Sequence, residues 1–259
     1  MSAETVMVGP APRLAVTVAG EGPLVLFLHG IRGNRQNWAV QIDTFAAAGY
    51  KAAAWDARGY GDSEDYDSAL QFDHFSGDVM RVAEHFGVNK LHLVGLSMGG
   101  RIARNVALRF PERLLSLTLV STAPGFDALS AEQVRRFVTE HRNRTPESVQ
   151  RLLGSRARTE AFGELSDSLS RVREESYRKT LIASVAQDRD APVENIRVPT
   201  MIVAGDEDKV YPTRIARELA QRIPGSEIVL MRGAGHLPNL ERPGRFNEIL
   251  LDFLKRRSK

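Results

Sequence analysis

Cysteine is absent from this chain of 259 residues. A chain without cysteine has no disulfide framework, no thiolate nucleophile and no cysteine-ligated metal site. Long apolar runs are missing too, since no stretch approaches the roughly 18 apolar residues of a transmembrane helix. The first residues also lack a basic segment followed by an apolar one, the pattern of a secretory signal. From these absences we expect a cytoplasmic protein with no membrane partner.

The chain has no marked excess of either charge, because 35 lysines and arginines face 32 aspartates and glutamates. The net charge is only +3, and a nucleic-acid-binding protein would need a clustered basic face. The basic residues near the C-terminus are typical of a solvated helix end, where cations complement the helix dipole. The charge pattern therefore argues against a nucleic-acid partner.

Short apolar runs alternate with longer helical patterns along most of the chain. Near-continuous apolar strands of this kind are typical of a parallel sheet covered by helices on both faces. The alternation predicts an α/β protein with a doubly wound, mostly parallel sheet of about eight strands. We expect the first two runs to form a hairpin. The predicted strands are residues 13–20, 24–30, 51–56, 91–96, 114–122, 200–205 and 226–231, and the predicted helices are residues 36–48, 72–86, 98–110, 213–222 and 245–255.

The alternation stops between the fifth and sixth of these runs, in a polar, helical stretch without strands. We interpret residues 124–196 as a helical lid inserted above the strand ends, and residues 1–123 and 197–259 as the core domain. Packing helices that simply add a layer to the core are the alternative. Pro199 marks the return of the chain to the sheet.

The sequence GLSMG, from Gly95 to Gly99, lies between a predicted strand and a predicted helix. A nucleophilic serine in a sharp strand-to-helix turn needs small neighbours, because its backbone is strained. The context therefore predicts Ser97 as a nucleophile, with a structural serine as the bland alternative.

A serine hydroxyl needs a base to take its proton and an acid to orient that base. His236 lies in a loop after the last predicted strand, where α/β proteins place their sites. Asp208 follows the preceding strand and is our predicted acid, with Asp206 as the alternative. The order Ser97, Asp208, His236 is the order of the triad in α/β hydrolases.

An oxyanion that develops during acyl transfer needs two fixed N–H donors. We predict the backbone N–H of Met98, directly after the nucleophile, and that of Ile31, in the loop after the second predicted strand. His29 precedes this loop, and we expect it to brace the loop by hydrogen bonds; a catalytic role is the alternative.

The sequence resembles the α/β-hydrolase superfamily along almost its whole length, through the motifs HGIRGNRQNW, WDARGYGDS, GLSMGG, AGDEDKVYP and GHLPNLERP. The resemblance implies the same triad, the same oxyanion donors and a lid. Its serine-nucleophile branch includes β-ketoadipate enol-lactonases, small carboxylesterases and meta-cleavage C–C hydrolases. Haloalkane dehalogenases and epoxide hydrolases of this fold carry aspartate at the elbow instead.

Four further residues are candidates for binding substrate. Arg32 and Arg101 are near the expected site in the sequence, and either could bind a substrate carboxylate through two hydrogen bonds. A surface ion pair for Arg32 and a bracing role for Arg101 are the alternatives. Trp38 and Phe126 would line an apolar pocket, or else belong to the core.

The sequence therefore predicts a serine hydrolase that acts through an acyl-enzyme on a small carboxylic ester or lactone. The alternatives are a C–C bond hydrolase, a cofactor-free perhydrolase, and a receptor that keeps the triad but turns over its ligand slowly; an interaction scaffold would not need the triad. We expect a small-molecule substrate, no cofactor and no metal, since no HExxH or clustered carboxylate pattern occurs.

Overall fold

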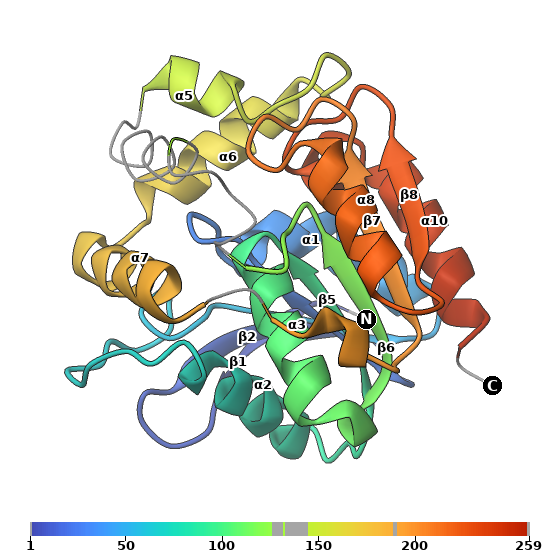
Figure 1. Ribbon diagram of the computed structural model, residues 1–259. Helices are drawn as coiled ribbons and strands as arrows, with labels where there is room; N and C mark the ends of the chain where they lie inside the picture. Colours follow the sequence, from blue (N-terminus) through green and yellow to red (C-terminus); the bar gives the residue numbers. More distant parts are fainter. Residues whose placement is uncertain (1, 126–131, 133–144, 189–190, 258–259) are drawn as a thin grey trace.

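The fold is built on one eight-stranded sheet. The computed structural model describes residues 2–125, 132, 145–188 and 191–257. The strand order across the sheet is β1-β2-β4-β3-β5-β6-β7-β8 (Figure 1). The strands are β1 (Glu4–Val8), β2 (Leu14–Ala19), β3 (Leu24–Leu28), β4 (Lys51–Trp55), β5 (Leu91–Leu96), β6 (Leu114–Val120), β7 (Thr200–Gly205) and β8 (Glu227–Met231).

Six of the strands run parallel, from β4 through β8 in the sheet order, and two antiparallel pairings form one edge. This confirms the predicted α/β class and the mostly parallel sheet. The predicted hairpin between the first two runs is wrong. β2 pairs with β1 and β4, and β3 pairs with β4 and β5. The helical crossover after β3 places β4 between β3 and β2. β2 forms its hairpin with β1 instead, a strand that was not predicted.

Helices cover both faces of the sheet. One apolar cluster joins α2, α3 and α8 to one face, and a second joins α1 and α10 to the other. The central strands β3 and β5 are buried at every residue, as expected for strands covered on both sides. Among the described helices, none is long and apolar enough to cross a bilayer. The helices of the two layers are α1 (Ala39–Ala47), α2 (His74–His85), α3 (Met98–Arg109), α8 (Thr213–Arg222) and α10 (Pro243–Lys255).

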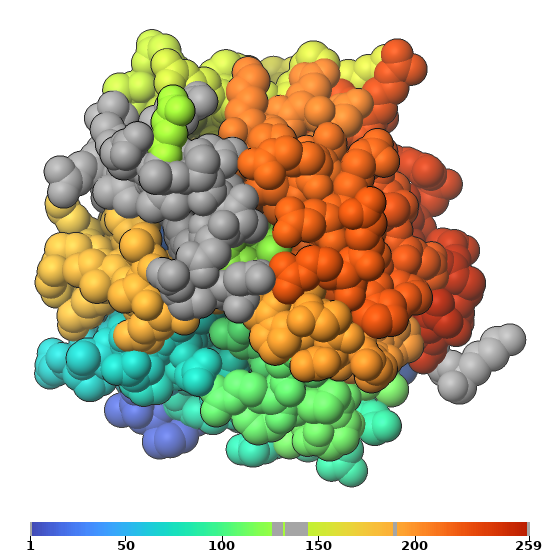
Figure 2. Space-filling model, in the orientation of Figure 1, coloured from blue at the N-terminus to red at the C-terminus, as the bar shows by residue number. Residues whose placement is uncertain are grey.

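Three numbered α-helices of the described residues lie between β6 and β7: α5 (Pro146–Gln150), α6 (Glu160–Ser170) and α7 (Glu174–Gln187). α5 and α6 lie together at one end of the molecule, and α7 stands apart from them beside the loop that follows β4 (Figures 1 and 2). Arg173 and Lys179 tie α7 to this loop, with hydrogen bonds to the carbonyl oxygens of Gly59 (3.0 Å) and Tyr66 (2.8 Å). The helical stretch predicted between the strands is therefore attached to the sheet domain by polar contacts, and also by buried apolar residues that belong to the two core clusters.

His92, the second residue of β5, is a titratable group inside the core. Its side chain has no solvent exposure, and its Nδ1 lies 2.8 Å from the Ser116 hydroxyl on β6. Burial lowers the pKa of His92 from its ordinary 6.5 to about 4, because a charged ring would lose its hydration. As the pH falls below 6.5, the unfolded chain therefore binds a proton that the folded chain does not.

We predict that His92→Gln reduces the acid sensitivity of the fold. The wild-type free energy of unfolding should fall between pH 7 and pH 5, with about 2 kcal/mol of the loss due to His92. Urea titrations of wild type and variant at pH 7 and pH 5 measure the free energy of unfolding. H92Q should lose about 2 kcal/mol less than wild type between these two pH values. His85→Gln, at an exposed position, is the control. An unchanged pH dependence in H92Q would contradict the assignment.

Candidate active site

Ser97 stands at a strained point of the backbone, between the end of β5 and the start of α3. Its φ of 55° lies in the left-handed region, which a residue with a side chain rarely occupies. Three hydrogen bonds hold the turn: Ser97 N–H donates to the Val120 carbonyl (2.8 Å), and the Ser97 carbonyl accepts from the Thr122 hydroxyl (2.7 Å) and the Arg101 N–H (3.1 Å). The turn therefore has the geometry predicted from the GLSMG motif.

The two flanking glycines are required by close backbone contacts. A Cβ on Gly95 would lie 2.1 Å from the Gly99 carbonyl oxygen, and a Cβ on Gly99 would lie 2.3 Å from the Leu28 carbonyl oxygen. Both distances are far below van der Waals contact, and both neighbours are backbone atoms that cannot rotate away. Only glycine fits at either position, which is the physical reason for the motif.

His236 and Asp208 meet at the carboxyl ends of β8 and β7. The Nδ1 of His236 lies 2.9 Å from one carboxylate oxygen of Asp208. The other oxygen accepts the N–H groups of Val210 (2.8 Å) and Tyr211 (3.0 Å). An ionised carboxylate is an acceptor only, so Nδ1 carries the proton and Nε2 is left as the basic nitrogen. This is the tautomer that a general base needs.

Asp206, the alternative acid, is placed differently. It is exposed, and its carboxylate accepts the Gly233 N–H at 2.6 Å, at the beginning of the loop that carries His236. It therefore braces the loop backbone, while Asp208 contacts the imidazole.

The predicted oxyanion donors are on two sides of Ser97. Met98 is the first residue of α3, and N–H groups in the first turn of a helix have no acceptor within the helix. On the other side, a Cβ on Gly30 would lie 3.4 Å from the Ser97 Cβ, so the backbone leading into Ile31 lies next to Ser97. Both N–H groups thus belong to backbone that adjoins Ser97.

His29 is fully buried directly before this loop. Its Nδ1–H donates to the Gly30 carbonyl (2.7 Å), and its Nε2 accepts the Ala57 N–H (3.0 Å). Burial lowers the pKa of His29, which favours the neutral ring that these two bonds require. Both ring nitrogens are used, so His29 braces the loop, as expected from the sequence.

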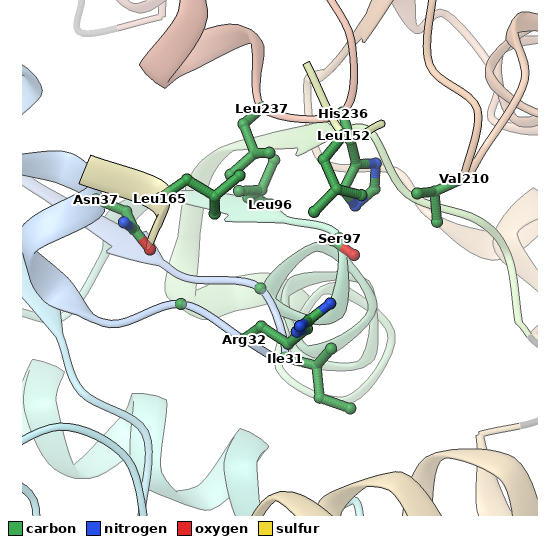
Figure 3. A pocket seen from close by; sticks show the side chains of 12 residues that line it. Ile31, Arg32, Asn37, Leu96, Ser97, Leu152, Leu165, Val210, His236 and Leu237 are labelled. Atoms are coloured by element: carbon green, nitrogen blue, oxygen red, sulfur yellow. The ribbon is translucent and has the colours of Figure 1, made fainter. Parts of the chain in front are cut away.

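Ser97 and His236 line the same pocket. Figure 3 shows the Ser97 hydroxyl and the His236 ring next to each other in this pocket. Most of the wall is aliphatic. The aliphatic residues are Ile31, Leu96, Leu152, Leu165, Val210 and Leu237; the others are Gly30, Arg32, Gly33 and Asn37.

A family model of the alpha/beta hydrolase fold matches residues 23–243, which is most of the chain. The chain belongs to the α/β-hydrolase family. The resemblance seen in the sequence motifs is therefore confirmed.

Individual relatives of this α/β hydrolase differ in their activities. A 2-hydroxy-6-oxononadienedioate/2-hydroxy-6-oxononatrienedioate hydrolase of Paraburkholderia phymatum is 30% identical, over 92% of this chain and 88% of the relative. The dihydrolipoyllysine-residue acetyltransferase component of the acetoin cleaving system of Pseudomonas putida is also 30% identical, over 96% of this chain and 70% of the relative. These comparisons therefore establish the family, whereas the reaction has to be inferred from the site.

Solved structures agree on the fold. An esterase from Exiguobacterium antarcticum superimposes with a TM-score of 0.87 at 22% identity, covering 98% of this chain and all of the other. The enol-lactonase from Burkholderia xenovorans gives a TM-score of 0.83 at 22% identity, covering 97% of this chain and all of the other.

The two candidate arginines of this hydrolase have different environments. Arg32 is half-buried and lines the pocket, and Figure 3 shows its guanidinium below Ser97, on the side away from His236. Arg101 is 1% exposed and forms an ion pair with Asp188, which also pairs with Arg104. This is the bracing position considered from the sequence. The geometry gives no support to Arg101 as a substrate ligand, because its guanidinium group already forms an ion pair with the buried Asp188 carboxylate.

Trp38 belongs to the core and does not reach the pocket. It is fully buried and its ring stacks on Phe27, with ring centroids 5.0 Å apart. Phe126 lies outside the described residues. Within those residues, no group of three or more histidine or acidic side chains could hold a metal ion.

Sequence reasoning missed the residues that shape the pocket wall. Leu152 and Leu165 come from the helical stretch between β6 and β7, about 55 to 70 residues from Ser97 in the chain. The spacing of Leu165 and Leu169 on one face of α6 was a usable signal for a buried face. It could not show that this face lies in the same pocket as Ser97.

We predict that Asp208→Asn lowers the rate at which a fluorophosphonate labels Ser97 by about 10⁴-fold, because the amide no longer holds His236 in the basic tautomer. Asp206→Asn, at the exposed position next to it, should stay within about tenfold of wild type. Labelling followed by intact-protein mass spectrometry gives both rates. A larger loss in D206N than in D208N would show that the acid is wrongly assigned.

Proposed function

We propose that this α/β hydrolase is a serine hydrolase that cleaves a small carboxylic ester or lactone through an acyl-enzyme. The main support is the environment of Ser97, where the strained turn, the His236–Asp208 pair and two backbone donors converge on one pocket. No single one of these features is sufficient. Together they supply a nucleophile, a base with the required tautomer and a place for a developing negative charge.

In the first half of the reaction, Ser97 Oγ attacks the substrate carbonyl carbon while Nε2 of His236 takes its proton. The carbonyl π bond opens and the oxygen becomes negative, facing the N–H groups of Ile31 and Met98. Asp208 stabilises the imidazolium that has formed. When the oxyanion collapses, the bond to the leaving alkoxide breaks, and Nε2–H gives that oxygen its proton.

The second half repeats these steps with water. Nε2 takes a proton from water, the hydroxide attacks the acyl carbonyl, and collapse of the second oxyanion returns the proton to Ser97 Oγ. For an ester, the balanced reaction consumes one water and releases a carboxylic acid and an alcohol. For a lactone, the alcohol oxygen stays bonded through the chain to the acyl group, so the same single water gives one hydroxy acid.

The pocket favours a largely apolar substrate. Its aliphatic wall would be buried against hydrocarbon, which is worth roughly 0.8 kcal/mol for each CH₂ group. Arg32 is the one cationic side chain that lines the pocket among the described residues. A single carboxylate on the substrate could therefore be paired, while the rest of the substrate would contact leucine and valine side chains.

C–C bond hydrolysis is the second candidate, and the relative from Paraburkholderia phymatum is the observation that favours it. The substrate in that relative's name is a dioate, which carries two carboxylates. The described wall of this pocket offers one cation and six aliphatic residues, which suits a dianion less well than an ester or lactone. We therefore rank ester or lactone hydrolysis first.

We predict that Ser97→Ala lowers kcat for ester hydrolysis by about 10⁶ without unfolding the protein. A panel of p-nitrophenyl esters, lactones and a vinylogous 1,5-diketone, assayed on wild type and S97A, tests both candidates. Sustained turnover of esters or lactones supports our proposal, and turnover of the diketone alone replaces it with C–C hydrolysis. A single burst of product on every substrate would identify a receptor that keeps the triad.

A second prediction concerns Arg32. Arg32→Gln should raise KM about tenfold or more for an ester that carries a free carboxylate, because a charge-assisted hydrogen bond is lost. KM for a neutral ester of the same length should change less than threefold. Arg245→Gln, an exposed arginine paired with Glu248 on α10, is the matched control. Equal changes for both esters would exclude Arg32 as the carboxylate ligand.

A further inference from the structure

Glu241 is an acidic residue buried close to the proposed base. It ends the short helix α9 (Pro238–Glu241) and is 1% exposed. One carboxylate oxygen accepts the N–H groups of Gly154 (2.6 Å) and Gly235 (2.8 Å), and the other accepts the N–H of Leu237 (2.9 Å). Burial raises the pKa of Glu241 and these three bonds oppose the rise, because they favour the ionised form.

Two of the three donors are the residues on either side of His236. Gly235 and Leu237 are therefore both fixed by one side chain, while the N–H of His236 itself donates to the Leu152 carbonyl at 2.7 Å. Three consecutive backbone N–H groups are held in this way. The direction in which the imidazole leaves the backbone depends on these bonds, whereas Asp208 fixes the rotation of the ring through its contact with Nδ1.

The third donor belongs to a different part of the chain, the segment 152–155 before α6. Gly154 donates to Glu241, and Leu152 in the same segment lines the pocket. At its other end, Ser155 donates its N–H (2.7 Å) and its hydroxyl (2.6 Å) to Glu207, next to Asp208. The segment thus connects the loop of the acid to the loop of the base.

The backbones of segment 152–155 and the His236 loop are too close for side chains between them. A Cβ on Gly154 would lie 2.5 Å from the Gly233 carbonyl oxygen, and a Cβ on Gly235 would lie 2.4 Å from the Leu152 carbonyl oxygen. The N–H groups of Gly154 and Gly235 therefore need an acceptor from a residue that lies outside both segments. The Glu241 carboxylate, with two oxygens on a flexible stem, serves both segments at once.

We propose that Glu241 is a positioning residue for catalysis, whose carboxylate sets the orientation of His236 and joins it to the pocket wall at Leu152. It touches no substrate and acts through His236. This proposal rests on the proposed function, since it assumes that His236 is the general base. A role in folding stability alone is the competing explanation.

Glu241→Gln is the decisive variant. The amide keeps one acceptor oxygen, but its NH₂ group must then face a backbone N–H, donor against donor. We expect kcat for a p-nitrophenyl ester to fall about 10-fold to 100-fold, because small misplacement of a catalytic group is costly. Rates are counted per active site, by titration with a fluorophosphonate, so that unfolded protein does not contribute. Glu248→Gln, on the exposed face of α10, is the control.

Glu207→Gln tests the contacts of Ser155 separately from the contact between Gly154 and Glu241. It weakens the bonds to Ser155 without touching the backbone of residues 235–237, so we expect it to raise KM more than it lowers kcat. Glu241→Gln should do the reverse. If E207Q reproduces the kcat loss of E241Q, the effect comes from the pocket wall, and the positioning of His236 by Glu241 is wrong.

A readout independent of turnover is the downfield proton signal of the His236 Nδ1–H in its hydrogen bond to Asp208. In protein labelled with ¹⁵N-histidine, this signal should be present in wild type and E248Q, and broadened or lost in E241Q. If wild type hydrolyses no ester, the proposed function fails while this test still applies. An E241Q variant with wild-type kcat and an unchanged signal would overturn the proposal, even if its Tm is lower.

Discussion

The left-handed backbone at Ser97 is the constraint on which the site depends. A residue with a side chain in this region costs on the order of 1–3 kcal/mol, so the surrounding structure must hold it there. The hydrogen bonds to Val120 and Thr122 do so, and the absence of side chains at Gly95 and Gly99 lets α3 begin directly against β3. As a consequence, the hydroxyl projects into the pocket and the adjacent N–H of Met98 lies at the positive end of α3.

The other members of the site are arranged around this turn by buried polar side chains. His29 fixes the loop that carries Ile31, Asp208 orients the His236 ring, and Glu241 holds the backbone beside that ring. Each of these side chains accepts or donates two or more hydrogen bonds, which offset the cost of removing it from water. The sheet supplies the positions of the loops, and these polar contacts supply their orientation.

Among the described residues, buried charged pairs lie in the interior and one cation lines the pocket. Arg101 and Arg104 share the buried Asp188, so their guanidinium groups serve the packing of α3. Arg32 lines the pocket beside Ser97. Together with the aliphatic wall, this arrangement is the basis of our proposal that the substrate is a small, mostly apolar ester or lactone.

The sequence alone determined the class of the fold, seven of its eight strands, and the short motifs around Ser97, Asp208 and His236, because local apolar runs and glycine-flanked turns carry this information. It did not determine that β4 inserts between β2 and β3, that Arg101 is buried against Asp188, or that Trp38 belongs to the core. The leucines of the pocket and the contacts of Glu241 were also decided by the tertiary structure. All of these features depend on contacts between residues far apart in the chain. The local sequence pattern indicates helices, strands and turns, but it does not indicate which distant side chains come into contact.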